Sequence, residues 1–167
     1  METRKTVQAI LDGLQRGDLE QVSSMLAERF RFRGRVAGAM DAKAWLGMCA
    51  SLKAAFPNLD YRFEIVEQHE GVIVLSARLS GTHTGDLDLT DIMDIGVIPA
   101  TYKSFRAEPQ TAEITVDQGR VSAWVEEPAE GAGLLAILQL LDVYIADAII
   151  PHSIRQLDNA QRTSASF

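Results

Sequence analysis

The sequence has little of what metal and redox sites need, with one cysteine and three histidines among 167 residues. Cys49 has no second thiol to pair with, which excludes an internal disulfide, a Cys-x-x-Cys site and a cysteine-rich zinc site. The histidines, His69, His83 and His152, have no neighbours at metal-ligand spacing. We therefore predict no metal site and no cofactor, and a reducing compartment suits the chain.

Basic runs and uninterrupted apolar segments are also missing. The net charge is −7 without a basic stripe, which argues against nucleic acid as a partner and against an anionic membrane surface. The longest apolar stretch, residues 132–150, is interrupted by Gln139, Asp142 and Asp147, and an aspartate at mid-membrane costs about 3 kcal/mol. We interpret it as a buried helix. Because the first residues lack the apolar core of a signal peptide, we expect a cytoplasmic protein.

Three common catalytic and binding motifs are absent. There is no Gly-x-Ser-x-Gly elbow to hold a nucleophile and no glycine-rich phosphate loop. The acidic segment with Asp86, Asp88, Asp91 and Asp94 lacks the glycine and closing glutamate of an EF-hand loop. These absences leave a catalytic triad, a nucleotide site and a calcium site without support.

What is present is an ordinary globular composition, with 47% hydrophobic and 23% charged residues, in a chain long enough for one domain. Apolar residues at helical spacing predict a first helix over 7–14 that ends at Gly17. Asp18 and Asp41 are good N-caps for two further helices. The helix that starts at Asp41 must end before Pro57.

Beyond Pro57 the apolar period changes from helical to two residues, which is typical of strands. Strands are predicted at 30–34, 61–66, 72–75, 103–116 and 121–127. The long loop 85–102 lies between them, and a loop of this length in a small domain is usually functional. Helices followed by antiparallel strands indicate an α+β fold, in which a curved sheet with helices on one face encloses a conical cavity.

His83 is the first candidate for chemistry. It ends a strand whose odd-numbered residues, from Ile73 onward, form the more apolar face, so we expect its side chain at the mouth of the cavity. A free imidazole titrates near pH ~6.5 and could transfer protons. The alternative is a histidine that only fixes the following loop through a backbone hydrogen bond.

Arg106 and Glu108 share the parity of Ala112, so without a bulge they lie at the cavity rim. A carboxyl group in an apolar cavity has a raised pKa and can act as an acid or a base. The alternative is a surface ion pair. Six aromatic residues are expected to line the pocket, or else to form plain core: Trp45, Phe56, Tyr61, Phe63, Tyr102 and Trp124.

Four short motifs occur in a characteristic order: residues 55–58 (Ala-Phe-Pro-Asn), 81–85 (Gly-Thr-His-Thr-Gly), 98–101 (Ile-Pro-Ala-Thr) and 131–140 (Gly-Ala-Gly-Leu-Leu-Ala-Ile-Leu-Gln-Leu). Together they resemble the SnoaL-like polyketide cyclases of the nuclear-transport-factor-two-like superfamily. The resemblance implies a cystatin-like α+β cone over residues 1–141, with residues 142–167 as a C-terminal helical extension of the same domain.

The resemblance also implies a cofactor-independent enzyme of the cyclase or isomerase type, acting on a small polyketide-like or ketone molecule. His83 and Glu108 would then be catalytic, with Arg106 and the aromatic residues as ligand contacts. Family members often carry an acid two positions before a large apolar residue, where this chain has Ala112. A binding protein of the same shape, without turnover, therefore remains an alternative, and an assembly unit is a third.

Two further expectations concern surfaces. The outward positions of the strand after residue 71 mix apolar and short polar residues, which predicts a homodimer through the outer sheet face: Val72, Val74, Ser76, Arg78 and Ser80. The family often has glycine where this chain has Leu141, so we expect the last helix to run on past that point. The tail would then cover either the mouth of the cavity or a partner subunit, and we favour a lid or a combined lid and dimer contact, with a break or kink at Pro151.

Overall fold

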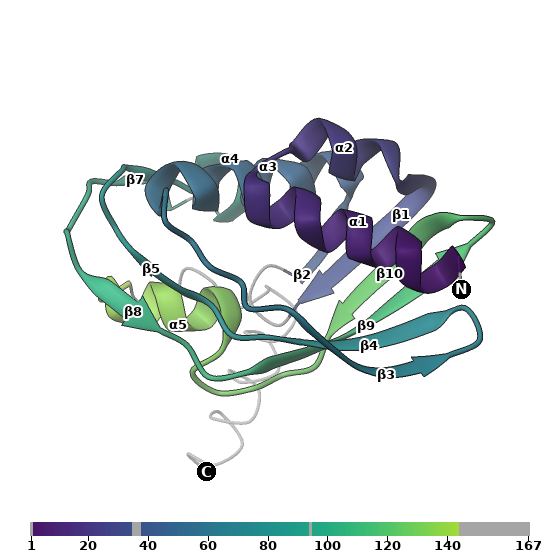
Figure 1. Ribbon diagram of the computed structural model, residues 1–167. Coiled ribbons are helices and arrows are strands. Elements are labelled where there is room, and N and C mark those ends of the chain that lie inside the picture. The colour runs from purple at the N-terminus through teal and green to yellow at the C-terminus, as the bar shows by residue number, and fades with distance from the viewer. Residues whose placement is uncertain (1, 35–37, 94, 144–167) are drawn as a thin grey trace, which may run out of the picture.

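The computed structural model describes residues 2–34, 38–93 and 95–143. A curved six-stranded sheet carries helices on one face (Figure 1). The helices are α1 (Glu2–Arg16), α2 (Leu19–Ser24), α3 (Ala42–Ala55), α4 (Thr90–Met93) and α5 (Gly133–Leu140). The strands are β1 (Leu26–Gly34), β2 (Gly38–Asp41), β3 (Glu64–His69), β4 (Val72–Ala77), β5 (Ser80–Thr82), β6 (Leu87–Asp88), β7 (Val97–Ile98), β8 (Ser104–Arg106), β9 (Gln110–Asp117) and β10 (Arg120–Glu126).

The main sheet has the strand order β2-β1-β10-β9-β4-β3. All neighbouring strands are antiparallel except β1 and β10, which pair in parallel. Two small ribbons, β5-β8 and β6-β7, extend the fold beside it. The predicted α+β class with a curved mixed sheet is confirmed.

The first three helices follow the local signals in the sequence. The predicted apolar stripe of α1 is buried against the sheet. Asp18 accepts a hydrogen bond from the backbone N–H of Gln21 at 3.1 Å, and Asp41 accepts one from Ala44 at 2.9 Å. These side chains satisfy N–H groups that the first turn of a helix leaves without partners. The third helix ends before Pro57, as predicted.

The strand predicted over residues 103–116 is in fact two strands in different sheets. β8 pairs with β5, whereas β9 pairs with β4 and β10. Pro109 lies between them and has no N–H to donate to a sheet. The buried positions change parity across it, from Ala107 to Gln110 and Ala112. The prediction that Glu108 shares a face with Ala112 was therefore wrong.

The last described helix is shorter than predicted. α5 ends at Leu140, and Asp142 takes a left-handed backbone conformation with φ of 56°. The Nζ of Lys103 donates to the carbonyl oxygen of Leu140 at 3.3 Å and to Asp142 at 3.2 Å. The helix does not continue through Leu141, so this part of the prediction was wrong. The predicted lid and the break at Pro151 lie outside the described residues.

Two of the sequence motifs form one structural joint between α3 and β5. The Asn58 Oδ1 accepts a hydrogen bond from the N–H of Thr82 at 2.9 Å. The N–H groups of Thr84 and Gly85 both donate to the carbonyl oxygen of Ala55, at 3.1 and 3.0 Å. A Cβ at Gly85 would lie 2.2 Å from the carbonyl oxygen of residue 54. The glycine at this position is thus required by close backbone packing.

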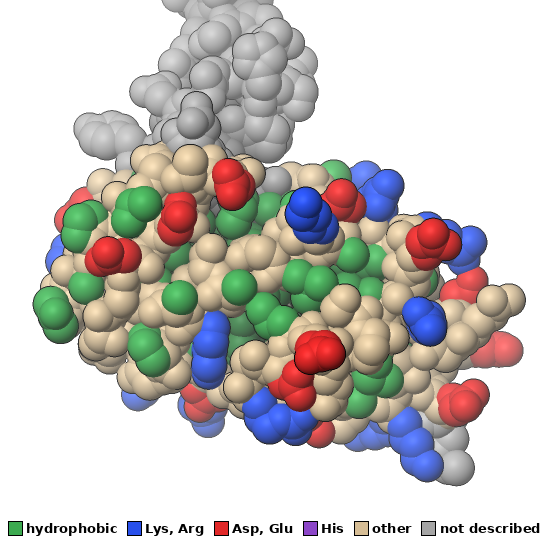
Figure 2. Space-filling view, turned by 90° about the horizontal axis from the view of Figure 1, so that it is seen from above, with side chains coloured by type: hydrophobic (Ala, Val, Ile, Leu, Met, Phe, Trp, Pro, Cys, Tyr) green, Lys and Arg blue, Asp and Glu red, His purple; other side chains and the backbone are tan. Residues whose placement is uncertain are grey.

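The molecular surface seen from above carries no large patch of one charge. Acidic and basic side chains alternate around small groups of hydrophobic ones (Figure 2). Within the described ranges, no helix is long and apolar enough to span a membrane.

Candidate functional site

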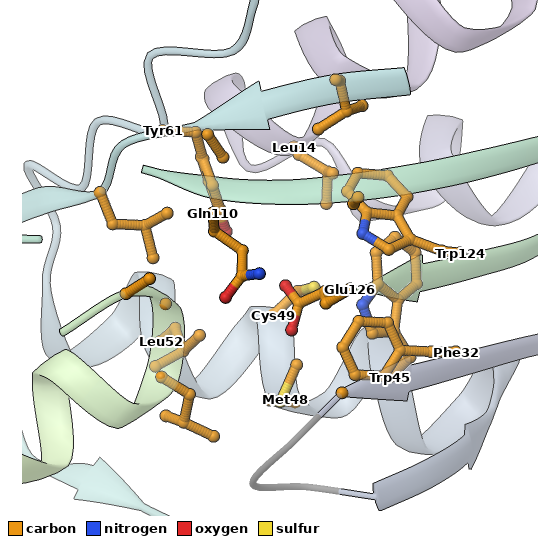
Figure 3. A pocket seen from close by; sticks show the side chains of 18 of the residues that line it. Leu14, Phe32, Trp45, Met48, Cys49, Leu52, Tyr61, Gln110, Trp124 and Glu126 are labelled. Atoms are coloured by element: carbon orange, nitrogen blue, oxygen red, sulfur yellow. The ribbon is translucent and has the colours of Figure 1, made fainter. Parts of the chain in front are cut away.

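A cavity lies between the sheet and the helices α1, α3 and α5. Its walls come from α1, β1, α3, β4, β9, β10, the segment before β3 and residues 129–135 (Figure 3). Most of the lining side chains are aliphatic or aromatic. Such a cavity suits a small and largely apolar organic molecule.

Aromatic rings form one side of the cavity. The ring of Trp45 packs at 5.3 Å from Trp124 and at 6.1 Å from Phe32, measured between centroids. Tyr61 stacks on Phe63 at 4.8 Å with nearly parallel planes. All five line the cavity. The structure therefore brings together four of the aromatic residues singled out from the sequence, namely Trp45, Tyr61, Phe63 and Trp124.

Glu126, at the end of β10, directs its carboxyl group into this apolar space (Figure 3). Its side chain follows Trp124 by two residues, so both lie on the same face of the strand. Burial raises the pKa of Glu126 from 4.5 to about 7, because an ionised carboxylate loses hydration there. Near neutral pH the group is therefore present in both protonated and ionised forms.

Two small residues on the neighbouring strands make room for this carboxyl group. A Cβ at Gly34 on β1 would lie only 2.8 Å from the Glu126 Oε1. On the other side, Ala112 on β9 is paired directly with Glu126. Thus the position where the resemblance implies an acid holds alanine, and the carboxyl group comes from the adjacent strand instead.

Gln110 is the second polar group of the cavity (Figure 3). The residue is only 6% exposed. Its Nε2 donates to the backbone oxygens of Thr111, at 3.2 Å, and Glu127. Both amide hydrogens are therefore used. The Oε1 lies 3.2 Å from where a Cβ at Gly133 would be, and within the described part of the chain no donor is in hydrogen-bond range of it.

Two other titratable groups in the cavity stay neutral. Burial, assisted by the nearby Glu126, raises the pKa of the Cys49 thiol to about 12. Burial likewise raises the pKa of Tyr61 well above its ordinary value. A thiolate nucleophile is not formed at neutral pH under these conditions. Among the described residues that line the cavity, Glu126 is the one whose pKa lies near 7.

His83 is fully buried and does not line this cavity. Its ring stacks on Phe56 at 5.1 Å, and its Nδ1 accepts a hydrogen bond from the Thr101 N–H at 3.1 Å. Burial lowers the pKa of His83, an effect that the charge of Asp86 partly offsets. The ring is thus a neutral group that ties the end of the long loop to the sheet, which is the alternative role considered from the sequence.

The remaining predicted site residues are also away from the cavity. Glu108 and Arg106 are exposed, and Tyr102 is 73% exposed with φ of 61°. Phe56 is buried between His83 and Phe105 rather than in the cavity wall. A catalytic or ligand role for these residues has no support from the geometry and stays a sequence prediction.

Sequence reasoning missed Glu126 and Gln110. The signal for Glu126 was available, because Trp124 was already assigned to the cavity and the strand period is two. The signal for Gln110 was available too, because it lies two residues before Ala112 and shares its face of the strand. In the ranges that the structure describes, no group of three or more His, Cys, Asp or Glu residues could hold a metal ion.

Solved structures with the same architecture are numerous. A candidate SnoaL-like polyketide cyclase from Jannaschia sp. CCS1 superposes with a TM-score of 0.66 at 21% identity, over 86% of this chain and 93% of that one. IdmH, a candidate polyketide cyclase from Streptomyces antibioticus, gives 0.62 at 19% identity, over 86% and 100%. A candidate polyketide cyclase from Xanthomonas campestris gives 0.64 at 16% identity, over 84% and 96%.

These likenesses establish the fold alone. No curated protein matches the sequence. The family model for SnoaL-like polyketide cyclase, however, matches residues 4–127, which include most of α1 and the whole strand that carries Glu126. The chain belongs to the SnoaL-like polyketide cyclase family.

Proposed function

We propose that this protein is a cofactor-independent acid–base enzyme of the cyclase or isomerase type, with Glu126 as the proton-transferring group. The substrate is a small, largely apolar ketone of polyketide type. The observation that carries the proposal is a carboxyl group with a pKa of about 7, pointing into a cavity walled by aromatic and aliphatic side chains. A general acid–base group is most effective when its pKa lies near the working pH.

The reaction would begin with ionised Glu126 removing a proton from the carbon next to the substrate carbonyl. The C–H electron pair becomes the carbon–carbon double bond of an enolate, and the carbonyl π pair moves to oxygen. In an isomerisation, the protonated Glu126 returns the proton to another carbon. In an aldol cyclisation, the enolate carbon attacks a second carbonyl, and the resulting alkoxide takes the proton. Neither sequence consumes another reactant.

Deuterium exchange tests the first step without knowledge of the natural substrate. We expect the protein to accelerate exchange of the C1 protons of 2-tetralone in D₂O, measured by NMR, with a rate that rises with pH to a plateau above about pH 7. Glu126→Gln should remove the acceleration. Glu113→Gln is the matched control, because Glu113 is exposed on the neighbouring strand and carries the same charge.

Exchange that is no faster with the protein than with buffer, despite binding of 2-tetralone, would contradict the proposal. The second candidate function, a binding protein without turnover, would then apply. Ala112 favours that candidate, because no titratable side chain of β9 lines the cavity. Calorimetry of 2-tetralone binding beside the exchange measurement separates the two functions.

The proposal also includes a cytoplasmic homodimer. The outward residues Val72, Val74 and Ser76 of β4 are half-buried, and β4 lies within the main sheet between β9 and β3. This mixture of apolar and short polar side chains supports a subunit interface at the outer face of the sheet. Size-exclusion chromatography with light scattering at micromolar concentration should give twice the monomer mass, and a monomer would contradict this part.

A further inference from the structure

The amide group of Gln110 has its orientation fixed by the backbone around it. Two carbonyl oxygens, of Thr111 and Glu127, accept hydrogen bonds from the Nε2. A flipped amide would place the Oε1 against both carbonyl oxygens, where nothing can be donated. The network therefore fixes the amide, with the Nε2 held by the two carbonyl oxygens and the Oε1 beside Gly133, which also lines the cavity.

An amide oxygen can only accept hydrogen bonds, and it does so at every ordinary pH. Glu126, in contrast, changes between donor and acceptor as it titrates near pH 7. The cavity thus offers Glu126 for proton transfer and the Gln110 oxygen as an acceptor that does not change with pH. Gln110 is 6% exposed, and no described residue donates a hydrogen bond to its Oε1, so a donor on a bound ligand would be the partner of this atom once the cavity is filled.

The two groups are separated by the geometry of the β9–β10 pair. Ala112 is directly opposite Glu126, and Gln110 comes two residues before Ala112 on the same face. Such diagonal neighbours in an antiparallel pair are roughly 7–8 Å apart. A ligand that contacts both side chains must place its recognised group several bonds away from the carbon that reacts.

We propose that Gln110 selects substrates that carry a hydroxyl group, phenolic or enolic, on the part of the molecule remote from the reacting ketone. The hydroxyl donates to the Gln110 Oε1 while the carbon next to the ketone faces Glu126. This inference rests on the proposed function, because it takes the cavity as the substrate site. It names the substrate class as ketones that carry a hydroxyl group several bonds away from the reacting carbon.

A pair of matched probes tests the inference by binding alone. 6-Hydroxy-2-tetralone and 6-methoxy-2-tetralone have the same ring system, but only the first can donate a hydrogen bond. By isothermal titration calorimetry at pH 7, we expect the hydroxy compound to bind roughly tenfold more tightly, as befits one hydrogen bond to a buried acceptor. Equal affinities, or no binding of either probe, would overturn the inference.

The Glu126→Gln variant shows which residue accepts the hydrogen bond from the hydroxyl group of the probe. We expect the tenfold preference to persist there, because Gln110 is untouched, whereas a loss of the preference would mean that the Glu126 carboxylate was the acceptor and would overturn the inference. Gln110→Met, with its near-ultraviolet circular dichroism checked against the wild type, should bring the two affinities within about twofold. A preference that survives in a folded Gln110→Met protein would equally overturn it.

Failure of this inference is distinguishable from failure of the proposed function. Preferential binding of the hydroxy probe without deuterium exchange at C1 would leave the role of Gln110 intact and remove catalysis by Glu126. Deuterium exchange in both probes, bound with equal affinity, would support catalysis by Glu126 and remove the role of Gln110.

Discussion

Gly34 and Glu126 face each other across the parallel pair of strands, and a Cβ on the glycine would lie 2.8 Å from the Glu126 Oε1. The end of a glutamate side chain can move aside, but the same Cβ would also lie 3.0 Å from two ring atoms of the buried Phe32, so Gly34→Ala should lower the free energy of unfolding by about 1–2 kcal/mol. It should also displace the carboxyl group and, if Glu126 transfers the proton as proposed, slow 2-tetralone exchange by roughly tenfold or more, because the carboxyl group would no longer be within reach of the substrate carbon.

The control for this variant is Gly47→Ala in α3, where an added Cβ meets nothing within 4 Å. An exposed helical glycine replaced by alanine should stabilise the protein by about 0.5–1 kcal/mol and leave the exchange rate unchanged. Equal exchange rates for both variants would show that Gly34 does not position Glu126.

The stability of the protein should depend on the ionisation of Glu126. Its pKa is about 7 in the folded state and near 4.5 in the unfolded chain. The folded protein therefore binds the extra proton between these values, and the contribution is fully present below about pH 4.5 and lost as the pH rises through about 7. The shift corresponds to at most about 3 kcal/mol, and partial contact with solvent reduces this to roughly 1–2 kcal/mol.

Urea unfolding of Glu126→Gln and the wild type at pH 4.5 and pH 8 measures this effect. The variant should gain roughly 1–2 kcal/mol relative to the wild type at the higher pH. Glu113→Gln, at an exposed position, serves as the comparison for loss of a charge. A constant difference between Glu126→Gln and wild type at both pH values would mean that the carboxyl group titrates normally.

His83 should have the opposite pH dependence. Its pKa is lowered in the folded state, so the buried ring contributes stability above about pH 6.5 that is lost as the pH falls. His83→Asn keeps an acceptor for the Thr101 N–H but cannot be protonated, and it should be less stable at pH 7.5 because the contact with Phe56 is reduced. Thermal unfolding at pH 7.5 and 5.5 should show the two proteins approaching each other in acid. A difference in melting temperature that is independent of pH would disprove the account.

The joint between α3 and β5 gives a prediction about stability alone. In Gly85→Ala the new Cβ would lie 2.2 Å from the carbonyl oxygen of Ala54, and a backbone atom cannot move aside as a flexible side chain does. We expect a loss of about 2–3 kcal/mol in the free energy of unfolding, measured in urea, with Gly47→Ala again as the control. A Gly85→Ala protein as stable as the wild type would show that the two motifs are not held by close packing.

The elements that could be predicted from the sequence are those decided by neighbours along the chain. Asp18 and Asp41 cap their helices through residues three positions away, and the alternation from Ile73 to His83 holds throughout. The shift of parity at Pro109 could not be predicted from periodicity, because both sides of the break look equally strand-like. Only the pairing of β8 with β5 separates them.

The sequence predicted the aromatic residues that line the cavity, but the polar residues Glu126 and Gln110 were missed. Large apolar side chains such as Trp45 and Trp124 are buried almost regardless of topology, whereas a carboxyl group can enter a cavity only where its neighbours are small. Those neighbours, Gly34 and Ala112, lie on two other strands. Gly34 and Ala112 lie beside Glu126 only because of how the strands pair in the sheet, and no local sequence pattern indicates that pairing.

The parallel pairing of β1 with β10 has a consequence for folding during synthesis on the ribosome. During synthesis β1 leaves the ribosome early. One of its edges stays unpaired until nearly all of the domain has been synthesised, because its partner strand is residues 120–126. Contacts of such long sequence separation form slowly, and an unpaired strand edge invites aggregation. A nascent chain stalled before β10 would therefore depend on chaperones, and it would lack both the strand that closes the cavity and Glu126.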